Sequence, residues 1–393
     1  MAERGERVHT VVLGAGYTGT LTAIRLARRV RRGAVTLVNP SPLFTERLRM
    51  HQLATGQQLA EIALPDLLAA TGATFVQGRA RGIELAARRI DIDTDEGVTQ
   101  IGFDHLVCAT GSATDRAAVP GISEHAHTLD GPGAAAALAA RLRGLPRGGS
   151  VVVCGNGFTG VEAATEIAES FPHLRVMLLG RGEAGATMGA GARAHLDAAL
   201  NRLHIGVRSG VEVRKILPDA VELAGGELVR FDACLWTGGF VAPPLAREAG
   251  LHVDGQGRVI VDAFLRSVSH PEVFAVGDSA AVAMPWGVVH GTCQSGIPSA
   301  AHAADNVART IAGRTRRPFR FGYIHQPVSL GRRDAVIQFT RPDDSPRRWY
   351  LSGRAAVAYK ELVTSSPPIT FRLSRHFRVP QRLLASRGGT TTR

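Results

Sequence analysis

Val11-Val12-Leu13-Gly14-Ala15-Gly16-Tyr17-Thr18-Gly19 recurs later in the chain as Val152-Val153-Cys154-Gly155-Asn156-Gly157-Phe158-Thr159-Gly160, with an offset of 141 residues (155 − 14 = 141). The match continues past the glycines and pairs Ala23 with Ala164 and Ala27 with Ala168. Each copy follows an apolar β-branched run and precedes an alanine-rich segment, which is the context of a G-x-G-x-x-G turn between a strand and a helix. The two copies therefore predict two dinucleotide sites in one polypeptide.

The composition is that of an ordinary globular protein. The chain has 393 residues, of which 45% are hydrophobic and 20% charged, and its 45 glycines suit a fold with many tight turns. No apolar run approaches the ~20 residues that span a bilayer, and the polar start of the chain does not resemble a signal peptide. We therefore expect a cytoplasmic protein with two or three domains.

The net charge of +12 raises the question of a nucleic-acid partner. Nearly all of this charge is arginine, since Lys215 and Lys360 are the only lysines, and aromatic residues make up only 5% of the chain. No basic motif is interleaved with aromatic residues, so we expect no nucleic-acid partner. The basic segment Phe371–Val379 is compatible with an anionic membrane surface or with an edge strand.

The four cysteines form no C-x-x-C pair. Cys108, Cys154 and Cys234 lie in apolar strand-like runs, where cysteine usually acts as a small buried hydrophobe. The sequence therefore predicts neither a disulfide framework nor a metal site. Cys293 lies outside such a run.

The hydrophobic pattern predicts two strand–helix–strand units, one over residues 8–38 and the other over 150–180. In the first unit the helix is expected over 17–31, and further helices over 133–143 and 295–312. Alternating segments at 74–103 and 211–231 predict antiparallel strands.

We expect an α/β fold with two Rossmann-like FAD/NAD(P)-binding domains, the second inserted in the first, plus a small C-terminal α+β domain. The predicted limits are 1–120 and 255–318 for the FAD-binding domain, 121–254 for the NAD(P)-binding domain and 319–393 for the C-terminal cap.

The glycines of both motifs suit a pyrophosphate, which needs backbone N–H donors at a helix N-terminus and no Cβ in the way. About twenty residues later such folds offer a carboxylate to the adenosine ribose. The two equivalent positions are Asn39 and Gly180 (39 + 141 = 180). Asn39 can still hydrogen-bond a ribose, whereas Gly180 removes a carboxylate that would repel a 2′-phosphate, and Arg181 follows it. The second site is therefore predicted to prefer NADPH over NADH.

Two further segments end apolar strand-like runs. Val273 to Asp278 ends in Gly277-Asp278, and a carboxylate at the end of a strand can hold a ribityl hydroxyl of a flavin. Ala109-Thr110-Gly111 ends the run that starts at His105. Together with the two glycine motifs, these segments favour a flavin at the first site.

The chain resembles the two-dinucleotide-binding-domain flavoproteins of the pyridine nucleotide-disulfide oxidoreductase superfamily, most closely the branch of type II NADH dehydrogenases, apoptosis-inducing factor and ferroptosis suppressor. The resemblance covers residues 8–315 and implies FAD on Gly14, Gly16, Gly19, Asn39, Arg47, Thr110, Gly111, Gly277 and Asp278, with Arg47 in a region that approaches the flavin in the family. It implies NAD(P)H on Gly155, Gly157, Gly160, Arg181 and Gly238.

Three residues are candidates for a catalytic role. Glu162 resembles the family's glutamate near the nicotinamide amide, or is an acidic residue that suits the first turn of a helix. Cys293 would fall near the flavin, or serves in packing. Gln294 matches one of the glutamines that type II dehydrogenases place at the quinone pocket, whereas the next such position holds proline. His51 and His290 are candidate proton donors by position, or structural residues.

The chain departs from the disulfide reductases of this fold, because no paired cysteine is found. We therefore expect an FAD-dependent NAD(P)H oxidoreductase in which hydride passes from NAD(P)H to the flavin and electrons then pass to a quinone or quinone-like small molecule. Two alternatives stay open, namely a reductase of a ferredoxin-type carrier and a redox-sensing flavoprotein that turns over poorly. The sequence also leaves open a homodimer and peripheral contact with the inner face of a membrane through the basic tail.

Overall fold

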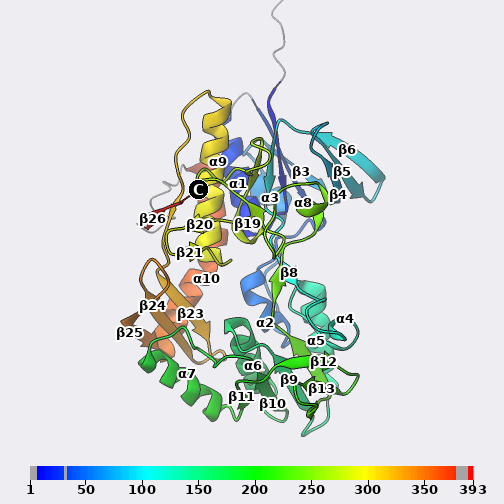
Figure 1. Cartoon of the computed structure of the whole chain (residues 1–393), viewed down its shortest axis with the longest axis vertical. Helices are drawn as coiled ribbons and strands as arrows, with labels where there is room; N and C mark the ends of the chain where they lie inside the picture. Colours follow the sequence, from blue (N-terminus) through cyan, green and yellow to red (C-terminus); the bar gives the residue numbers. More distant parts are fainter. Residues whose placement is uncertain (1–6, 31–32, 378–387, 393) are drawn as a thin grey trace, which may run out of the picture.

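A computed structural model describes residues 7–30, 33–377 and 388–392 of the chain. The molecule is elongated, with an upper lobe that contains the N-terminal strands and a lower lobe that contains the second glycine motif (Figure 1). Two short strands, β8 (Ala113–Thr114) and β16 (Phe240–Val241), lie where the chain passes between the lobes, and they pair antiparallel to each other. The lower lobe is thus inserted between two parts of the upper one.

The upper lobe is built on a five-stranded parallel sheet with the spatial order β18-β7-β1-β2-β3. Its strands are β1 (His9–Leu13), β2 (Ala34–Asn39), β3 (Ala73–Gln77), β7 (His105–Cys108) and β18 (Val273–Ala275). The central strand β1 is buried from its second residue on, as expected for a parallel strand covered on both faces. The chain returns from the lower lobe to add β18 at the edge of this sheet.

The lower lobe contains a parallel sheet with the spatial order β11-β10-β9-β15. Its strands are β9 (Ser150–Cys154), β10 (Arg175–Leu179), β11 (Gly206–Arg208) and β15 (Ala233–Trp236). The order repeats that of β3-β2-β1-β7 in the upper lobe, and the register repeats with it, since Val11 pairs with Thr36 and Val152 with Met177. The duplication seen in the sequence therefore extends to the pairing of the strands.

A helix follows the first strand of each copy directly. These helices are α1 (Tyr17–Ala27) and α6 (Phe158–Ser170). The long helix α9 (Cys293–Ile311) packs along α1, and Arg25 and Asp305 join the two helices with an ion pair of 2.7 Å. The predicted end of the first helix at residue 31 is wrong, because the chain turns after Ala27 so that Ala34 can donate to the Val8 carbonyl and start β2.

The remaining helices of the two lobes are short or lie on the lower lobe. They are η1 (Arg47–Arg49), α2 (Met50–Leu53), α3 (Leu64–Leu68), α4 (Ile122–His125), α5 (Pro132–Arg143), α7 (Ala190–Arg202), α8 (Leu245–Glu248) and η2 (Gly277–Ser279). The helix predicted at 133–143 begins one residue earlier with a proline, which is favoured in the first turn.

Each lobe also carries a three-stranded antiparallel sheet. The upper one consists of β4 (Arg79–Glu84), β5 (Arg89–Thr94) and β6 (Gly97–Gly102), and the lower one of β12 (Val213–Ile216), β13 (Ala220–Leu223) and β14 (Leu228–Arg230). Residues 74–77 were expected in the antiparallel group but belong to β3 of the parallel sheet, where they pair with β2. Six further strands have two residues each: β17 (Val259–Ile260), β19 (Ala280–Ala281), β20 (Ala283–Met284), β21 (Gly287–Val288), β22 (Arg320–Phe321) and β26 (Gly389–Thr390).

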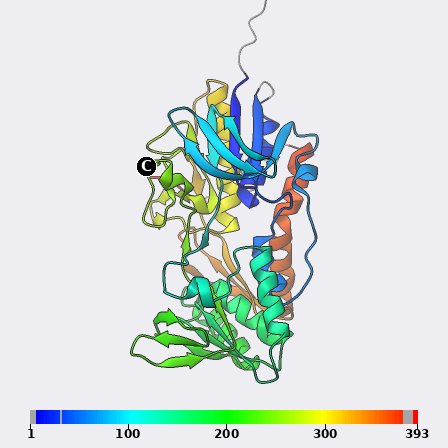
Figure 2. The ribbon, with the colours of Figure 1, turned by 90° about the vertical axis from the view of Figure 1, so that its right-hand side faces the viewer.

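The C-terminal part forms a small sheet and one long helix. The sheet contains β23 (His325–Ser329), β24 (Ala335–Thr340) and β25 (Pro346–Ser352), and the helix is α10 (Gly353–His376). Figure 2 shows α10 running along one side of the molecule from the lower lobe to the upper one. The helix is fixed at its upper end by Phe371, which packs edge-on against Phe44, while Phe44 packs edge-on against Tyr17 of α1.

The course of α10 corrects one expectation. An edge strand was considered for Phe371–Val379, but the residues up to His376 are helical. Residues 378 and 379 lie outside the described residues. Within the part of the chain that the structure describes, no helix is both long and apolar enough to cross a membrane.

Candidate functional site

The first glycine motif forms a cradle at the N-terminus of α1. Gly14 has a φ of +94°, and its N–H donates to the Val38 carbonyl at 2.9 Å, which brings the turn against β2. A Cβ on Gly19 would lie 1.7 Å from the Gly14 carbonyl oxygen, so only glycine allows the helix to start this close to the strand. In contrast, a Cβ on Gly16 would have no atom within 4 Å. The free space beside a helix N-terminus is where a pyrophosphate is bound in this fold.

The second motif repeats this geometry in the lower lobe. Gly155 has a φ of +113° and donates to the Leu179 carbonyl at 2.8 Å, and a Cβ on Gly160 would lie 1.7 Å from the Gly155 carbonyl oxygen. The position of a Cβ on Gly157 is again free of neighbours within 4 Å. Gly238 closes this cradle from the side, because a Cβ on Gly155 would lie 2.9 Å from its backbone nitrogen. Both cradles therefore have room for a phosphate.

The loop after β18 lies against the first cradle. A Cβ on Gly277 would lie 2.7 Å from the Thr18 side chain, so the Gly277-Asp278 turn touches the glycine motif. Asp278 accepts a hydrogen bond of 2.7 Å from the Ser112 hydroxyl through Oδ2. No hydrogen bond to its Oδ1 is seen in the described part of the chain, so this oxygen can accept a hydroxyl of a ribityl chain.

The loop after β7 completes the same region. The Gly111 N–H donates to the Ser279 hydroxyl at 2.8 Å, and the Thr110 hydroxyl lies 3.2 Å from it. The Arg47 guanidinium donates to the Ser112 carbonyl at 2.5 Å. The structure thus brings Arg47, Thr110, Gly111 and Asp278 together, and it adds Ser112 and Ser279, which sequence reasoning missed. Both serines lie next to predicted residues, and this adjacency was the signal available.

Asn39 reaches back from the end of β2 to the first motif. Its Oδ1 accepts from the Ala15 N–H at 2.9 Å, and its Nδ2 donates to the Ser41 carbonyl at 2.9 Å. An amide has one further lone pair and one further N–H, which can still serve a ribose. The cradle, Asp278 and Asn39 therefore fit the phosphates, ribityl chain and ribose of FAD.

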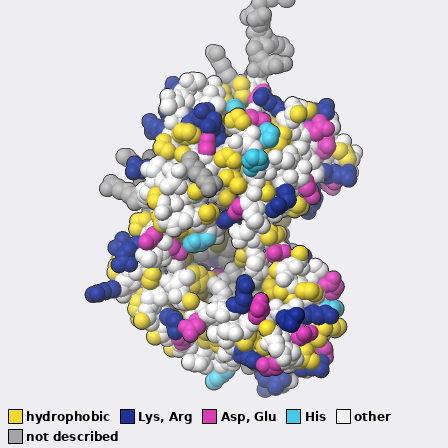
Figure 3. Space-filling model, viewed as in Figure 1, with side chains coloured by type: hydrophobic (Ala, Val, Ile, Leu, Met, Phe, Trp, Pro, Cys, Tyr) yellow, Lys and Arg dark blue, Asp and Glu magenta, His cyan; other side chains and the backbone are white. Residues whose placement is uncertain are grey.

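The surface is hollowed between the two lobes, near the lower end of α9 and above α6 (Figures 1 and 3). Three candidate residues are found in the two helices. Glu162 is in the first turns of α6, Cys293 is the first residue of α9, and Gln294 is the second. Arg181 is exposed in the loop after β10, beside the second cradle.

Glu162 forms a largely buried ion pair with Lys360 of α10, with each side chain 14% exposed. Its carboxylate also accepts from the Ser329 N–H at 3.0 Å. Burial disfavours the charge of Glu162, but the Lys360 ammonium, reinforced by the Ser329 hydrogen bond, outweighs it and holds the pKa of the carboxyl below its usual range. The charged pair joins the lower lobe to the C-terminal helix, and Lys360 was not identified from the sequence. The available signal was that Lys360 is one of only two lysines in a chain whose cations are nearly all arginine.

Cys293 and Gln294 differ in their surroundings. Burial raises the pKa of the Cys293 thiol to about 11, so the group is a thiol and not a thiolate at neutral pH. Gln294 is bonded on both sides of its amide, because Oε1 accepts from the Ile324 N–H at 2.7 Å and Nε2 donates to the His325 carbonyl at 3.1 Å. Gln294 therefore anchors the C-terminal sheet to α9.

The two candidate histidines are in different environments. Burial lowers the pKa of His51 to about 4, so its ring is neutral at pH 7, and its Nε2 has no hydrogen-bond partner among the described residues. His290 is exposed, stacks on Tyr323 at 4.3 Å and lies 3.4 Å from Asp344. His51 is therefore buried but neutral, and His290 has an acidic neighbour but is exposed.

A second buried carboxyl group lies one turn after Glu162. Glu166 is fully buried, its Oε1 accepts a 2.5 Å hydrogen bond from the Gln57 amide, and its Oε2 has no partner among the described residues. Burial raises the pKa of Glu166 to about 7. Sequence reasoning missed this residue, because an acidic residue in an otherwise apolar helix face was not distinguished from an exposed one.

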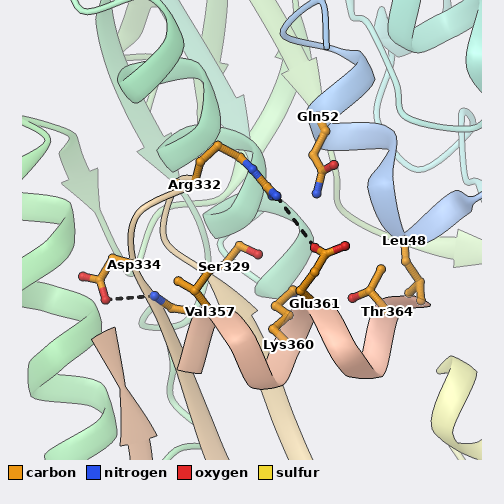
Figure 4. Close-up of a pocket in the computed structure, with 11 residues that line it drawn as sticks. Leu48, Gln52, Ser329, Arg332, Asp334, Val357, Lys360, Glu361 and Thr364 are labelled. Atoms are coloured by element: carbon orange, nitrogen blue, oxygen red, sulfur yellow. Dashed lines mark hydrogen bonds and ion pairs between the residues drawn. The ribbon is translucent and has the colours of Figure 1, made fainter. Parts of the chain in front are cut away.

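A small cavity of about 10 Å³, about the volume needed for one water molecule, lies beside this cluster (Figure 4). It is bounded by residues of η1, of α2, of the β23–β24 turn and of α10. In Figure 4, Arg332 points toward Glu361, and an ion pair of 3.8 Å joins them. In the described chain no cluster of three or more histidine, cysteine or acidic side chains is suited to a metal ion.

Two glycine cradles on two parallel sheets of the same strand order define a protein with two dinucleotide-binding domains. The chain belongs to the pyridine nucleotide-disulphide oxidoreductase family, whose model matches residues 8–306. This result confirms the predicted resemblance, the α/β fold class and the assignment as an oxidoreductase.

Comparison with individual proteins gives the same result. The chain is 30% identical over 352 residues to an NADH dehydrogenase-like protein of Mycobacterium tuberculosis, covering 83% of this chain and 86% of that one. It is 28% identical to the demethylphylloquinone reductase NdbB of Synechocystis, with 91% of each chain covered. The fold matches the sulfide:quinone oxidoreductase of Aquifex aeolicus with a TM-score of 0.80 at 21% identity, over 93% of this chain and 92% of that one. At this identity the structural match shows the fold alone.

The pKa of Glu166 predicts a specific pH dependence of stability. Because folding raises this pKa from its ordinary value of 4.5 to about 7, the carboxyl group stabilises the fold below pH 4.5, and this contribution is lost as the pH rises to about 7. Glutamine stays uncharged at every pH. We therefore expect the free energy of unfolding of Glu166→Gln, relative to that of the unchanged protein, to be about 3 kcal/mol higher at pH 8.5 than at pH 5. The measurement is the denaturant midpoint of both proteins at each pH.

The exposed Glu96→Gln variant is the control and should show no such gain. If the difference in midpoint between the Glu166→Gln variant and the unchanged protein is the same at both pH values, Glu166 is ionised in the folded protein and the assignment is wrong.

Proposed function

We propose that this protein is an FAD-dependent NAD(P)H oxidoreductase that passes electrons to a quinone or quinone-like small molecule. The observation that carries the proposal is the pair of phosphate cradles, one on each parallel sheet, with the Asp278 carboxylate in the turn that touches the first cradle. Bound FAD supplies the redox chemistry, accepting hydride from a nicotinamide and passing on two electrons.

The residues of the chain bind and orient the two nucleotides in this proposal. FAD is assigned to the cradle of Gly14, Gly16 and Gly19, in a domain of residues 1–120 and 255–318. The nicotinamide nucleotide is assigned to the cradle of Gly155, Gly157 and Gly160, in a domain of residues 121–254. Residues 319–393 are assigned to the cap, and the ion pair between Glu162 and Lys360 joins α10 of the cap to α6 of the second domain.

The acceptor is proposed on the side of the flavin that faces the cap. The relative in Synechocystis is named a demethylphylloquinone reductase, which supports a quinone. Lys360 pairs with Glu162 and lies close enough to His51 and Cys293 for its charge to act on their pKa values, and Glu166 follows Glu162 by one turn of α6. Groups that titrate near neutral pH, such as Glu166, suit the proton uptake that accompanies quinone reduction.

The assignment of the two sites predicts opposite losses for two matched variants. Gly16→Val and Gly157→Val each fill space that is free of protein atoms, so both should fold. We expect Gly16→Val to be purified without flavin. We expect Gly157→Val to be yellow but to bind NADPH and NADH at least about 100-fold more weakly, because the side chain takes the place of the pyrophosphate. Absorbance spectra under anaerobic titration with each nucleotide give both results, and Gly133→Val, in open space on α5, is the control.

The same titration distinguishes the alternatives when the reduced protein is mixed with a panel of quinones, a ferredoxin and oxygen. Fastest re-oxidation by a quinone supports the proposal. Fastest re-oxidation by ferredoxin, with a rate that falls as salt is raised, supports a carrier reductase instead. Slow bleaching by excess nucleotide supports a redox-sensing protein. A protein that is colourless and cannot be reconstituted with FAD contradicts the proposal as a whole.

We also propose that NADPH is preferred over NADH. The position that offers a ribose carboxylate in such folds is Gly180, and the exposed Arg181 beside it can bind a 2′-phosphate. We expect Arg181→Ala to lower kcat/KM for NADPH about tenfold or more and to change that for NADH less than about twofold, since one charge-assisted hydrogen bond is lost. Steady-state assays with both nucleotides measure this, with the exposed Arg214→Ala as the control. A higher kcat/KM for NADH in the unchanged protein would show that the preference is wrong.

Peripheral contact with a membrane is proposed through the outer face of α10. Leu362, Ile369 and Leu373 of α10 are 67%, 48% and 47% exposed and lie along one stripe of the helix. Phe377, which is 66% exposed, follows the last helical residue, and Arg372 directly precedes Leu373. Such a face suits binding to an anionic membrane surface. A protein bound there would have access to quinones dissolved in the bilayer. A homodimer stays a prediction.

Sedimentation with vesicles tests this contact. We expect the protein to pellet with phosphatidylglycerol vesicles at low salt, and the double variant Leu362→Glu with Leu373→Glu to stay in solution, because charge on the stripe opposes insertion. Val98→Glu, which alters an exposed valine on β6, should pellet like the unchanged protein. If the unchanged protein stays in solution at every lipid composition, α10 does not contact membranes.

A further inference from the structure

The two copies of the nucleotide motif have exchanged the position of one asparagine. With the offset of 141 residues, Ala15 corresponds to Asn156 and Asn39 to Gly180. In the upper lobe, the asparagine stands at the end of β2 and accepts a hydrogen bond from Ala15 of the glycine turn. In the lower lobe, the asparagine stands in the turn itself and donates through Nδ2 to the carbonyl of Gly182, beyond the end of β10. In both lobes an asparagine side chain thus links the glycine turn to the end of the second strand, but in the upper lobe it comes from the strand end and in the lower lobe from the turn.

The side chain of Asn156 takes the volume that a residue at position 180 would use. A Cβ on Gly180 would lie 2.0 Å from both Cγ and Oδ1 of Asn156. Position 180 is where a dinucleotide fold places the acidic side chain that binds the adenosine ribose. The amide of Asn156 therefore stands at the ribose position of the second site, although it comes from the phosphate loop.

We propose that Asn156 is the residue that recognises the adenosine ribose of the nicotinamide nucleotide. The inference rests on the proposed binding of NAD(P)H in the lower lobe. Because the Gly182 carbonyl can only accept, the NH₂ group of Asn156 must face it, and this fixes the orientation of the amide. Oδ1 then points away from that contact, has no hydrogen-bond donor among the described residues, and accepts from a ribose hydroxyl.

This arrangement separates two tasks that one carboxylate performs in other proteins of this fold. The amide is neutral, so it accepts from a ribose hydroxyl without repelling a 2′-phosphate. Arg181 is then the only group proposed here that distinguishes NADPH from NADH. Asn156 contributes to the binding of any nucleotide that carries adenosine ribose with a free hydroxyl, and contributes nothing to a nucleotide without adenosine.

Equilibrium binding to the flavin-loaded protein tests the role without turnover. We expect Asn156→Ala to raise the Kd for NAD⁺ about threefold to tenfold, the value of one neutral hydrogen bond. Nicotinamide mononucleotide has no adenosine, so its Kd should not change. Titration calorimetry with both ligands gives the two values, and the flavin spectrum should be the same as in the unchanged protein.

Two variants at position 180 provide a matched test. Gly180→Ala leaves Asn156 in the chain but displaces its amide, so it should raise the Kd for NAD⁺ as much as Asn156→Ala does, and the combined variant should add no further loss. The exchange Asn156→Ala with Gly180→Asn recreates the Ala15–Asn39 pair of the upper lobe. We expect this double variant to recover the affinity for NAD⁺ to within about twofold.

Three results would overturn the proposal. An unchanged Kd for NAD⁺ in Asn156→Ala shows that the amide does not contact the ribose. The proposed function of NAD(P)H as the hydride donor would not be affected by that result. An equal rise for NAD⁺ and nicotinamide mononucleotide shows that Asn156 only holds the loop. If the unchanged protein binds neither NAD⁺ nor NADP⁺, both the role of Asn156 and the proposed use of NAD(P)H as the hydride donor are wrong.

Discussion

The contact between backbone atoms at the start of α1 and α6 is the constraint on which the rest of the structure depends. A Cβ on Gly19 or Gly160 would lie 1.7 Å from a carbonyl oxygen of the preceding turn, so each helix starts against its strand with no side chain between them. This contact places the helix N-terminus at the end of the sheet. A Cβ on the middle glycine of each motif would have no atom within 4 Å. A phosphate cradle is the direct consequence, and the same backbone geometry produces it twice.

The position of the C-terminal helix depends on a second interaction, the ion pair between Glu162 of the lower lobe and Lys360 of α10. Glu162 and Lys360 are each 14% exposed, and a charge at this depth is stable only when it is paired. Because the partners lie on α6 and α10, the ion pair is made only when the C-terminal helix is docked on the lower lobe. The aromatic contacts among Tyr17, Phe44 and Phe371 fix the other end of α10 on the upper lobe. The long helix thereby connects both nucleotide domains beside the cluster of titratable groups.

The exchange of an asparagine between the two copies shows how duplicated sites diverge without loss of structure. The link between turn and strand end is kept in both lobes, but the residue that supplies it changes sides. Where Asn39 stands at the strand end, its amide is bonded to the protein on both sides. Where Asn156 stands in the turn, Oδ1 has no hydrogen-bond donor among the described residues, so both of its lone pairs are left for a ligand, whereas Oδ1 of Asn39 has one lone pair left. A single exchange thus alters which hydrogen-bonding atoms face the nucleotide, while the sheet and helix stay in register.

The sequence by itself determined the two glycine motifs, the strand–helix–strand unit around each of them and the candidate residues of the first cradle, because these depend on local backbone geometry at a fixed spacing. It also predicted Asp278 and Gly111, which lie in the loops after two neighbouring strands of the same sheet, β18 and β7. It did not reveal Lys360, Glu166, Ser279 or the role of Asn156, because these depend on contacts between segments far apart in the chain. Gln294 was predicted at an acceptor pocket, which stays a prediction, and the structure adds that its amide is bonded to the backbone at Ile324 and His325. Only the tertiary structure decides such roles, since burial and pairing set the charge of a side chain, and residue type alone does not.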